Sequence, residues 1–193
     1  MPILTNPTSL SEQGHVLWFS GLSGAGKTTL SKLVHTHLNL LGHKTVLLDG
    51  DIIRSGLCKD LGFSETDRNE NIRRISEVAR LFSINGIWAI IASISPYETH
   101  RLLAKDIIGP AFHHIYIKAS LDTCQKRDPK GLYERALSGH IPFFTGVSDR
   151  FEEPIWADLI VDTNQASIDQ SFHAIESYIR ITLTASAIIP VTA

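Results

Sequence analysis

The sequence predicts one three-layer α/β domain, in which helices cover both faces of a parallel five-stranded sheet. Two observations carry this prediction. Short apolar runs alternate with segments whose apolar residues recur at helical spacing. One run, residues 87–92, is almost wholly apolar, as expected of a central strand covered on both faces. A chain of 193 residues holds one well-buried core but is short for two. We therefore treat residues 1–193 as a single domain.

Strands are expected at residues 15–19, 44–48, 87–92, 113–117 and 159–162. The apolar stripes of four longer helices are Leu30, Leu33, Val34, Leu38 and Leu41; Ile72, Ile75, Ala79 and Phe82; Leu102, Leu103 and Ile107; and Ile168, Phe172, Ile175 and Ile179. Capping signals place the starts of the last three at Ser64, Ser95 and Ser167. Shorter helices are expected at residues 121–127 and 132–137.

Three segments carry little or no periodic pattern. Residues 1–13 are a polar, proline-containing N-terminal arm, and residues 181–193 are an apolar, threonine-rich C-terminal tail. Residues 128–154 are rich in Gly, Pro and charged side chains and contain one modest helical patch. Long irregular segments in compact domains are usually functional, so residues 128–154 are a candidate mobile lid.

Composition excludes several classes of function. The net charge of -2 and the pI near 6.5 give no electrostatic footprint for nucleic acid or an anionic membrane. No apolar run approaches the roughly 18 residues that span a bilayer. Cys58 and Cys124 are too few for a disulfide framework, and the N-terminus has no basic leader followed by an apolar core. We therefore expect a cytoplasmic protein with free thiols.

The chain is organised around residues 21–28, which fit the phosphate-binding pattern G-x-x-x-x-G-K-[ST] between an expected strand and an expected helix. Its glycines let backbone N–H groups turn toward phosphate oxygens, and the helix dipole points at the same place. Lys27 would reach the β- and γ-phosphates, and the Thr28 hydroxyl would ligate Mg²⁺. The pattern predicts a P-loop NTPase fold that binds ATP with Mg²⁺. The predicted ATP-binding residues are Gly21, Leu22, Ser23, Gly24, Ala25, Gly26, Lys27, Thr28 and Thr29.

The position of the free acids favours a small-molecule kinase. Motor ATPases and many GTPases hold the metal with an Asp at the end of a separate apolar strand, but here the third strand ends in Ala92-Ser93, and no N-K-x-D pattern is present. Asp49 and Asp51 instead end the second strand. A carboxylate there can position an acceptor hydroxyl and accept its proton. The alternative is that both residues cap the next turn.

Basic residues after the acid pair indicate an anionic acceptor. Guanidinium groups make bidentate bonds to phosphate or sulfate oxygens, and Arg54 and Arg68 lie in a loop and at a helix start, where binding residues concentrate. Asn71 lies beside them. For Arg73 and Arg74 we favour a solvated helix face balanced by neighbouring acids.

Several motifs together resemble the adenylylsulfate kinase family over about residues 14–180. They are the glycine loop at 21–29, Asp49-Gly-Asp51 with Arg54, Leu61-Gly-Phe63, residues 67–74, Ile94-Ser95-Pro96-Tyr97, residues 127–133 and Phe144-Thr145-Gly146. The resemblance implies transfer of the ATP γ-phosphate to the 3′-hydroxyl of adenosine 5′-phosphosulfate, giving PAPS for sulfate assimilation. It also implies a homodimer.

The resemblance assigns further roles to matching positions. Asp51 would orient or deprotonate the acceptor hydroxyl, with Lys27 and the family's active-site serine, Ser95, as the other catalytic residues. Ser95 could instead only cap a helix or bind ligand. The implied substrate-binding residues are Asp49, Arg54, Phe63, Arg68, Asn71, Ile94, Lys130 and Phe144. The two phenylalanines would sandwich the acceptor's adenine, although either could simply belong to the core.

The chain departs from the family pattern in two places. Glu98 follows Tyr97 where a basic residue is usual, and residues 147–151 replace an acidic pair followed by proline and tyrosine. These changes bear on lid closure and efficiency. The alternatives to this reaction are another small-molecule kinase, for nucleosides or sugar acids, and a non-catalytic ATP-binding regulatory module.

Overall fold

A computed structural model describes residues 13–184 of the chain, so most of the arm at 1–13 and of the tail at 181–193 lies outside the described residues. The strands are β1 (Val16–Ser20), β2 (Thr45–Asp49), β3 (Trp88–Ala92), β4 (Phe112–Lys118) and β5 (Leu159–Asp162). They form one sheet in the order β2-β3-β1-β4-β5, and every neighbouring pair is parallel. The predicted parallel five-stranded sheet is confirmed.

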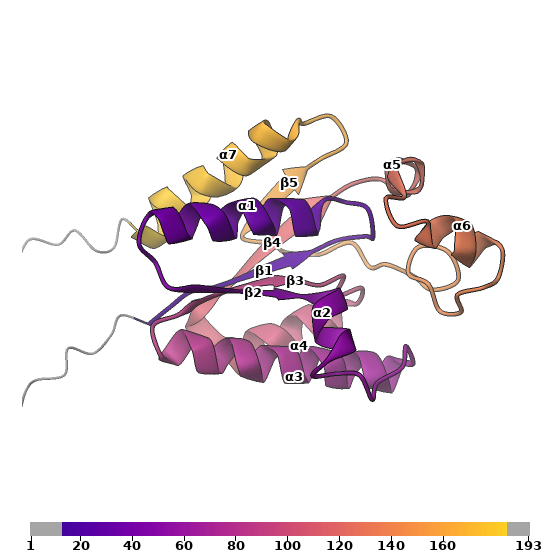
Figure 1. The fold of residues 1–193 in the computed structure, drawn as a ribbon, viewed down its shortest axis with the longest axis horizontal. Helices are drawn as coiled ribbons and strands as arrows, with labels where there is room; N and C mark the ends of the chain where they lie inside the picture. Colours follow the sequence, from indigo (N-terminus) through magenta and orange to yellow (C-terminus); the bar gives the residue numbers. More distant parts are fainter. Residues whose placement is uncertain (1–12, 185–193) are drawn as a thin grey trace, which may run out of the picture.

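The helices cover both faces of this sheet (Figure 1), with α1 and α7 on one face and α3 and α4 on the other. Their bounds are α1 Lys27–Leu40, α2 Gly50–Ser55, α3 Glu65–Ile84, α4 Glu98–Ile108, α5 Leu121–Arg127, α6 Leu132–Leu137 and α7 Ile168–Tyr178. A 3₁₀ turn, Gly109–Ala111, follows α4, and a π-helical segment, Ile179–Thr184, follows α7. The predicted three-layer arrangement is therefore confirmed.

Two apolar clusters lie on opposite faces of the sheet. All five residues of β1 and of β3 are buried, as their apolar runs predict. Leu38 of α1 and Ile175 of α7 pack in one cluster, while Ile75 of α3 and Ile108 of α4 pack in the other. Burying such side chains contributes about 1.5–3 kcal/mol each. The sheet is thus a rigid platform whose strand ends carry the polar loops.

The start of α4 differs from the prediction. Ser95 is not its N-cap: the helix begins at Glu98, and Ser95 has a φ of 45°, outside the extended region that a cap residue adopts. The N–H of Glu98 instead donates to the Glu152 carboxylate at 2.7 Å. A distant loop therefore supplies the cap, which no local pattern shows.

The buried face of α4 also differs from the prediction. Leu102 is exposed, whereas His100, Arg101, Ala104 and Ile108 are buried. Arg101 can be buried because its guanidinium group donates to the Glu98 carboxylate and to two backbone carbonyl oxygens.

Two smaller expectations were wrong. Leu33 and Leu41 of the first helical stripe and Ile168 of the last are exposed. The stretch around Arg54, expected to be an irregular connection, forms the short helix α2.

Candidate active site

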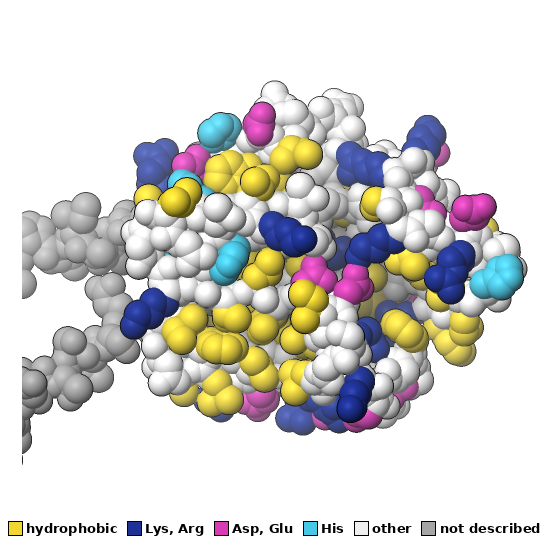
Figure 2. All heavy atoms as spheres, in the orientation of Figure 1, with side chains coloured by type: hydrophobic (Ala, Val, Ile, Leu, Met, Phe, Trp, Pro, Cys, Tyr) yellow, Lys and Arg dark blue, Asp and Glu magenta, His cyan; other side chains and the backbone are white. Residues whose placement is uncertain are grey.

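The carboxyl ends of β1, β2 and β3 open into a cavity of about 820 Å³. Every residue predicted for the site lines this cavity, apart from Gly21 and Leu22. Segments from distant parts of the chain complete the wall, including residues 127–135, which contain the start of α6, and the loop 141–145. Figure 2 shows acidic and basic side chains gathered around a hollow on the side of the molecule that carries α5 and α6. Ligands of open parallel sheets bind at this edge.

The phosphate loop connects β1 to α1 and needs its glycines. Gly21, Gly24 and Gly26 have φ values of 138°, 78° and 108°. A Cβ at Gly21 would lie 2.4 Å from the carbonyl oxygen of Ile117, and one at Gly24 would lie 3.0 Å from that of Cys124. No side chain of the described residues caps α1, and the first turn of this helix has no acidic residue. The N–H groups at this helix start are therefore available to an anion.

Lys27 lies beneath the phosphate loop. Its ammonium group is buried and donates to the carbonyl oxygens of Gly21 and Leu22, both at 2.8 Å. These two residues hold Lys27 although neither lines the cavity. Burial lowers the pKa of Lys27 to about 8. A phosphate oxygen would restore the compensating negative charge that the two neutral carbonyls lack.

The acid pair divides into two roles. The Asp49 carboxylate accepts from the Thr28 hydroxyl at 2.8 Å and from the backbone N–H of Asp51 at 3.0 Å, so it also caps α2. The capping alternative is therefore confirmed for Asp49, alongside its contact with the phosphate loop. Asp51 does not cap: its carboxylate is largely exposed at the cavity and forms an ion pair with Lys130. This ion pair joins two predicted site residues that are 79 positions apart.

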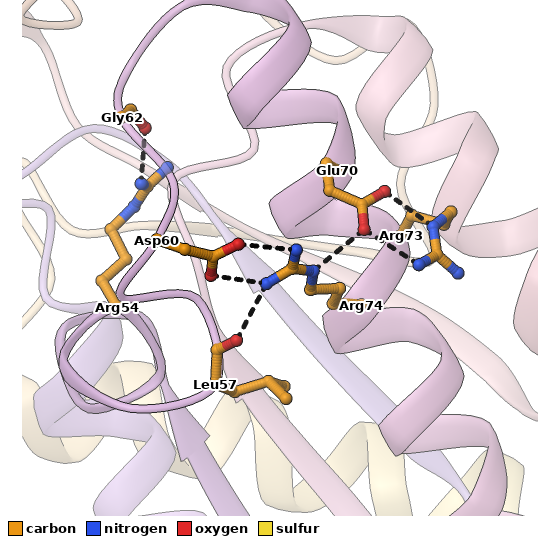
Figure 3. Close-up of polar contacts among 7 residues, drawn as sticks. All are labelled: Arg54, Leu57, Asp60, Gly62, Glu70, Arg73 and Arg74. Carbon is orange, nitrogen blue, oxygen red and sulfur yellow. Dashed lines mark hydrogen bonds and ion pairs between the residues drawn. The ribbon is translucent and has the colours of Figure 1, made fainter.

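We call the part of the cavity lined by Arg54, Phe63, Arg68, Asn71 and His100 its α3 end. The guanidinium group of Arg54 lies over the Phe63 ring, 4.4 Å from its centroid, and donates to the carbonyl oxygen of Gly62 (Figure 3). Phe63 is 51% exposed, so its ring can meet a ligand. The Asn71 side chain is buried, and its carbonyl oxygen has no partner among the described residues. Such an orphaned buried acceptor suits a ligand group that donates a hydrogen bond.

Arg68 is almost fully occupied within the protein. Its guanidinium group donates to the carbonyl oxygens of Phe63 and Phe143 and to the Thr145 hydroxyl, and it lies 3.3 Å from the Asp149 carboxylate. It therefore ties α3 to residues 143–149, a role that the sequence did not indicate.

Arg73 and Arg74 lie away from the cavity. Arg73 pairs with Glu70, and Arg74 bridges Glu70 and Asp60 on the outer side of α3 (Figure 3). The hydrogen bonds from both arginines hold the pKa of Glu70 at about 2. The interpretation of these arginines as a solvated helix face is confirmed, with Glu70 and Asp60 as their partners.

Ser95 lines the cavity although it is almost wholly buried. Its hydroxyl accepts from the indole N–H of Trp18 at 2.9 Å, and its carbonyl oxygen accepts from Arg101 at 2.8 Å. The position of the Ser95 hydroxyl is thus fixed by a buried residue of the central strand β1.

The segment 128–154 contains α6 and is anchored at several points. The Tyr133 hydroxyl donates to the carbonyl oxygen of Ser23 in the phosphate loop. Phe144 packs edge-to-face on Tyr133 with a centroid distance of 5.0 Å and contacts the core, and it also lines the cavity. Phe143, which sequence reasoning missed, is 60% exposed on the cavity wall and has a φ of 55°. Its only signal was its position beside Phe144.

Among the other lining residues that sequence reasoning missed, two are polar groups at separate places in the fold. His100 lies on α4, and Thr163 follows β5, where its hydroxyl accepts from Arg127 at 3.1 Å. No spacing pattern marks either position, because each reaches the cavity only through the packing of separate elements.

The fold and the site define a P-loop kinase of small molecules: a glycine loop opens a helix after the central strand β1, and two carboxylates, Asp49 at the end of β2 and Asp51 at the start of α2, face the same cavity across β3. The family model described as adenylylsulphate kinase matches residues 13–162. The chain belongs to the adenylylsulphate kinase family.

Relatives agree along most of the chain. It is 46% identical to an adenylyl-sulfate kinase of Paraburkholderia xenovorans over 158 residues, covering 82% of this chain and 88% of the relative. It is 47% identical to one of Geotalea uraniireducens over 180 residues, covering 91% and 86%.

Solved structures extend the agreement to three dimensions. The Mycobacterium tuberculosis APS kinase CysC in complex with AMPPNP and APS is 38% identical, with a TM-score of 0.83, covering 87% of this chain and 98% of the other. A hexameric APS kinase from Thiobacillus denitrificans is 31% identical, with a TM-score of 0.67, covering 88% of this chain and 29% of the other. A gluconokinase from Sinorhizobium meliloti, with 12% identity and a TM-score of 0.58, shares the fold alone.

Within residues 13–184, no helix combines the length and the apolar character needed to cross a membrane.

Proposed function

We propose that the protein transfers the γ-phosphate of ATP to the 3′-hydroxyl of adenosine 5′-phosphosulfate and so makes PAPS for sulfate assimilation. The observation that carries the proposal is that one cavity holds the phosphate loop, the Asp51 carboxylate and the arginine and aromatic side chains of the α3 end. Donor and acceptor can therefore meet within it. Relatives named adenylyl-sulfate kinases support the choice of acceptor.

The donor would occupy the phosphate loop. Backbone N–H groups of residues 21–29 would surround the β- and γ-phosphates, and Lys27 would exchange its carbonyl partners for phosphate oxygens. Arg127 and Thr163 lie at the same end of the cavity. Positioning and charge stabilisation are the main needs of phosphoryl transfer.

The Thr28 hydroxyl and the Asp49 carboxylate fit Mg²⁺. Both are hard oxygen ligands, and because the hydroxyl donates its proton to Asp49, its lone pairs stay available. When bound, Mg²⁺ would neutralise charge on the phosphoryl oxygens.

The acceptor would lie at the α3 end. The guanidinium groups of Arg54 and Arg68 and the side-chain amide N–H of Asn71 would face its phosphosulfate. Ile94 would line the same wall, and Phe63 would stack on its adenine opposite Phe144 or Phe143. The ribose 3′-oxygen would attack the γ-phosphorus as the bond to the β,γ-bridging oxygen breaks, and the Asp51 carboxylate would take the hydroxyl proton. ADP leaves as the second product. Lys130 must release Asp51 for this step, and transfer of Lys130 to a phosphate would do so.

If the γ-phosphate passes directly from ATP to the acceptor hydroxyl, Ser95 is not phosphorylated and its role is to position a ligand. Its hydroxyl is engaged by Trp18, and its buried position suits a fixed ligand contact better than a group that must be phosphorylated and hydrolysed in turn. Closure of residues 128–154 over the ligands and assembly as a homodimer are further parts of the proposal. The buried free thiols of Cys58 and Cys124 support a reducing compartment, the cytoplasm.

The test is ATP consumption with adenylyl sulfate, AMP or gluconate as acceptor, with the product identified by mass. We expect turnover only with adenylyl sulfate, together with inhibition at high acceptor concentration, because two adenine nucleotides occupy neighbouring parts of one cavity. Asp51→Asn should lower kcat by about 10²- to 10⁴-fold with ATP affinity little changed. Turnover with AMP or gluconate would identify another kinase, and nucleotide binding without any turnover would indicate a regulatory module.

A further inference from the structure

His100 is the buried titratable residue of the cavity wall that the proposed reaction does not use. It lies in the first turn of α4, and its side chain is 0% exposed while lining the cavity. Neither ring nitrogen has a hydrogen-bond partner among the described residues. The Tyr97 ring packs beside it, with a centroid distance of 4.8 Å. A buried imidazole without partners costs free energy unless a ligand or water meets it.

The contrast with other histidines is direct. His114 is equally buried, yet its ring nitrogens meet the Ser20 hydroxyl at 2.7 Å and the Trp156 carbonyl oxygen at 3.1 Å. His113 meets His15 and the Tyr178 hydroxyl. Both lie outside the cavity lining. Among these three, His100 is therefore the histidine of the cavity lining, and its ring nitrogens have no partner among the described residues.

His100 is uncharged in this position. Burial, and then the nearby guanidinium groups of Arg68 and Arg101, lower its pKa to about 4. At neutral pH the ring thus offers one N–H donor and one lone pair, and no charge. Because the ring is fully buried, a rotation about its terminal torsion, which is broad for histidine, would bring a nitrogen to the ligand oxygen.

The cations around His100 already have counter-charges. Arg68 pairs with Asp149, Arg101 with Glu98, and across the cavity Lys130 pairs with Asp51.

Arg54 has no carboxylate partner among the described residues. The Arg54 charge would be met by the 5′-phosphate that adenylyl sulfate and ADP share, so this end of the cavity offers the terminal group of either ligand hydrogen-bond donors with little further positive charge. Such a pocket suits an oxyanion with one negative charge better than one with two, because a second charge would be desolvated without a counter-ion.

Adenylyl sulfate and ADP differ in the negative charge that their terminal group carries. They share the adenosine 5′-phosphate part, but the terminal sulfuryl group carries one charge, whereas a terminal phosphate carries about −1.5 to −2 at neutral pH. ADP is also a product of the proposed reaction, so the acceptor pocket must exclude it during turnover. Resting on the proposed function, we propose that His100 donates a hydrogen bond to the sulfuryl end of the acceptor and so selects adenylyl sulfate over ADP.

The experiment measures the binding of both ligands at the acceptor pocket. The protein is first saturated with AMPPNP to fill the phosphate loop, and adenylyl sulfate or ADP is then titrated by calorimetry. The variants are His100→Met, which removes the donor at similar size, His100→Gln, which keeps an uncharged donor, and His113→Gln as a matched histidine outside the cavity. Thermal unfolding of each variant checks that it is folded.

We expect His100→Met to weaken adenylyl sulfate by about tenfold, the value of one lost hydrogen bond to a charged group, and ADP by less than threefold. The preference for adenylyl sulfate should therefore fall. His100→Gln should keep most of that preference, and His113→Gln should match the unaltered protein. Equal weakening of both ligands in His100→Met, or no weakening of either, would overturn the proposal.

A second measurement needs no variant. In protein carrying ¹⁵N-labelled histidine, adenylyl sulfate should shift the donor nitrogen of His100, and ADP should shift it less. An unmoved His100 resonance at saturating adenylyl sulfate would refute the contact. A protein that binds adenylyl sulfate through His100 but never turns it over would refute the proposed function alone, and normal turnover with unchanged selectivity in His100→Met would refute this inference alone.

Discussion

Proton uptake on ATP binding is a direct consequence of the environment of Lys27. Its ammonium group is buried against two neutral carbonyl oxygens, and burial lowers its pKa from 10.5 to about 8. In the free protein Lys27 should therefore be neutral in roughly a tenth of molecules at pH 7, about half at pH 8 and about nine tenths at pH 9. A triphosphate beside it favours the charged form. ATP binding should take up the missing proton.

The assay is calorimetry of ATP binding, without acceptor, in buffers of different ionisation enthalpy. The slope of the observed enthalpy against buffer enthalpy should report uptake of about 0.5 proton at pH 8 and about 0.9 at pH 9. ATP affinity should fall by up to about tenfold per pH unit above 8. Lys27→Met should remove this uptake, whereas Lys126→Met, at an exposed lysine paired with Asp122, should preserve it. Uptake that stays flat from pH 7 to 9 in the unaltered protein would refute the reasoning.

The same shift affects the stability of the free protein with a definite sign. The pKa of Lys27 is lower in the folded state than in the unfolded state, so between about pH 8 and 10.5 the unfolded chain binds more protons. The cost of burying the charge is fully present below pH 8 and is relieved as the pH rises through this window. The contribution of Lys27 to the free energy of unfolding should therefore rise by about 3 kcal/mol across it.

Three further predictions follow from single contacts. Arg68→Met should lower the free energy of unfolding by about 3 kcal/mol, measured in urea, because it leaves the Asp149 carboxylate without its cation; an unchanged urea midpoint would contradict this. Ser95→Ala should keep turnover within about tenfold, because one lost hydrogen bond is worth about 1–2 kcal/mol, whereas complete loss would support a phosphorylated serine. Gly21→Ala should weaken ATP binding by about a hundredfold or more, since backbone clashes and a strained φ cost several kcal/mol together; normal affinity in a filter-binding assay would show that the loop adapts.

Some features could be predicted because their causes are local. The glycine loop depends on backbone freedom at positions 21, 24 and 26, and the structure has a positive φ at each. The capping box that opens α7 at Ser167 and Gln170 is present as expected, because both of its hydrogen bonds join residues three apart. The apolar run of β3 is buried throughout.

Other features could not be predicted because their causes are distant. The residues around Ser95 fit the pattern of a helix start, so Ser95 was expected to cap α4. Instead, Ser95 is hydrogen-bonded to Trp18 and Arg101 outside the helix, and Glu152 caps α4. The residue type and position of Arg68 predicted anion binding, but most of its hydrogen-bond donors are used within the protein.

The sequence by itself determined the alternation of strands and helices, the phosphate loop and the family, since these depend on spacing along the chain. Only the tertiary structure decided which polar groups are occupied and which are open: Asp51 is paired with Lys130, while His100 and Asn71 keep atoms that no residue in 13–184 meets. The physical reason is that hydrogen bonds and ion pairs act over a few ångströms of space. The residues that satisfy them are brought together from positions far apart, by the packing of helices on a common sheet.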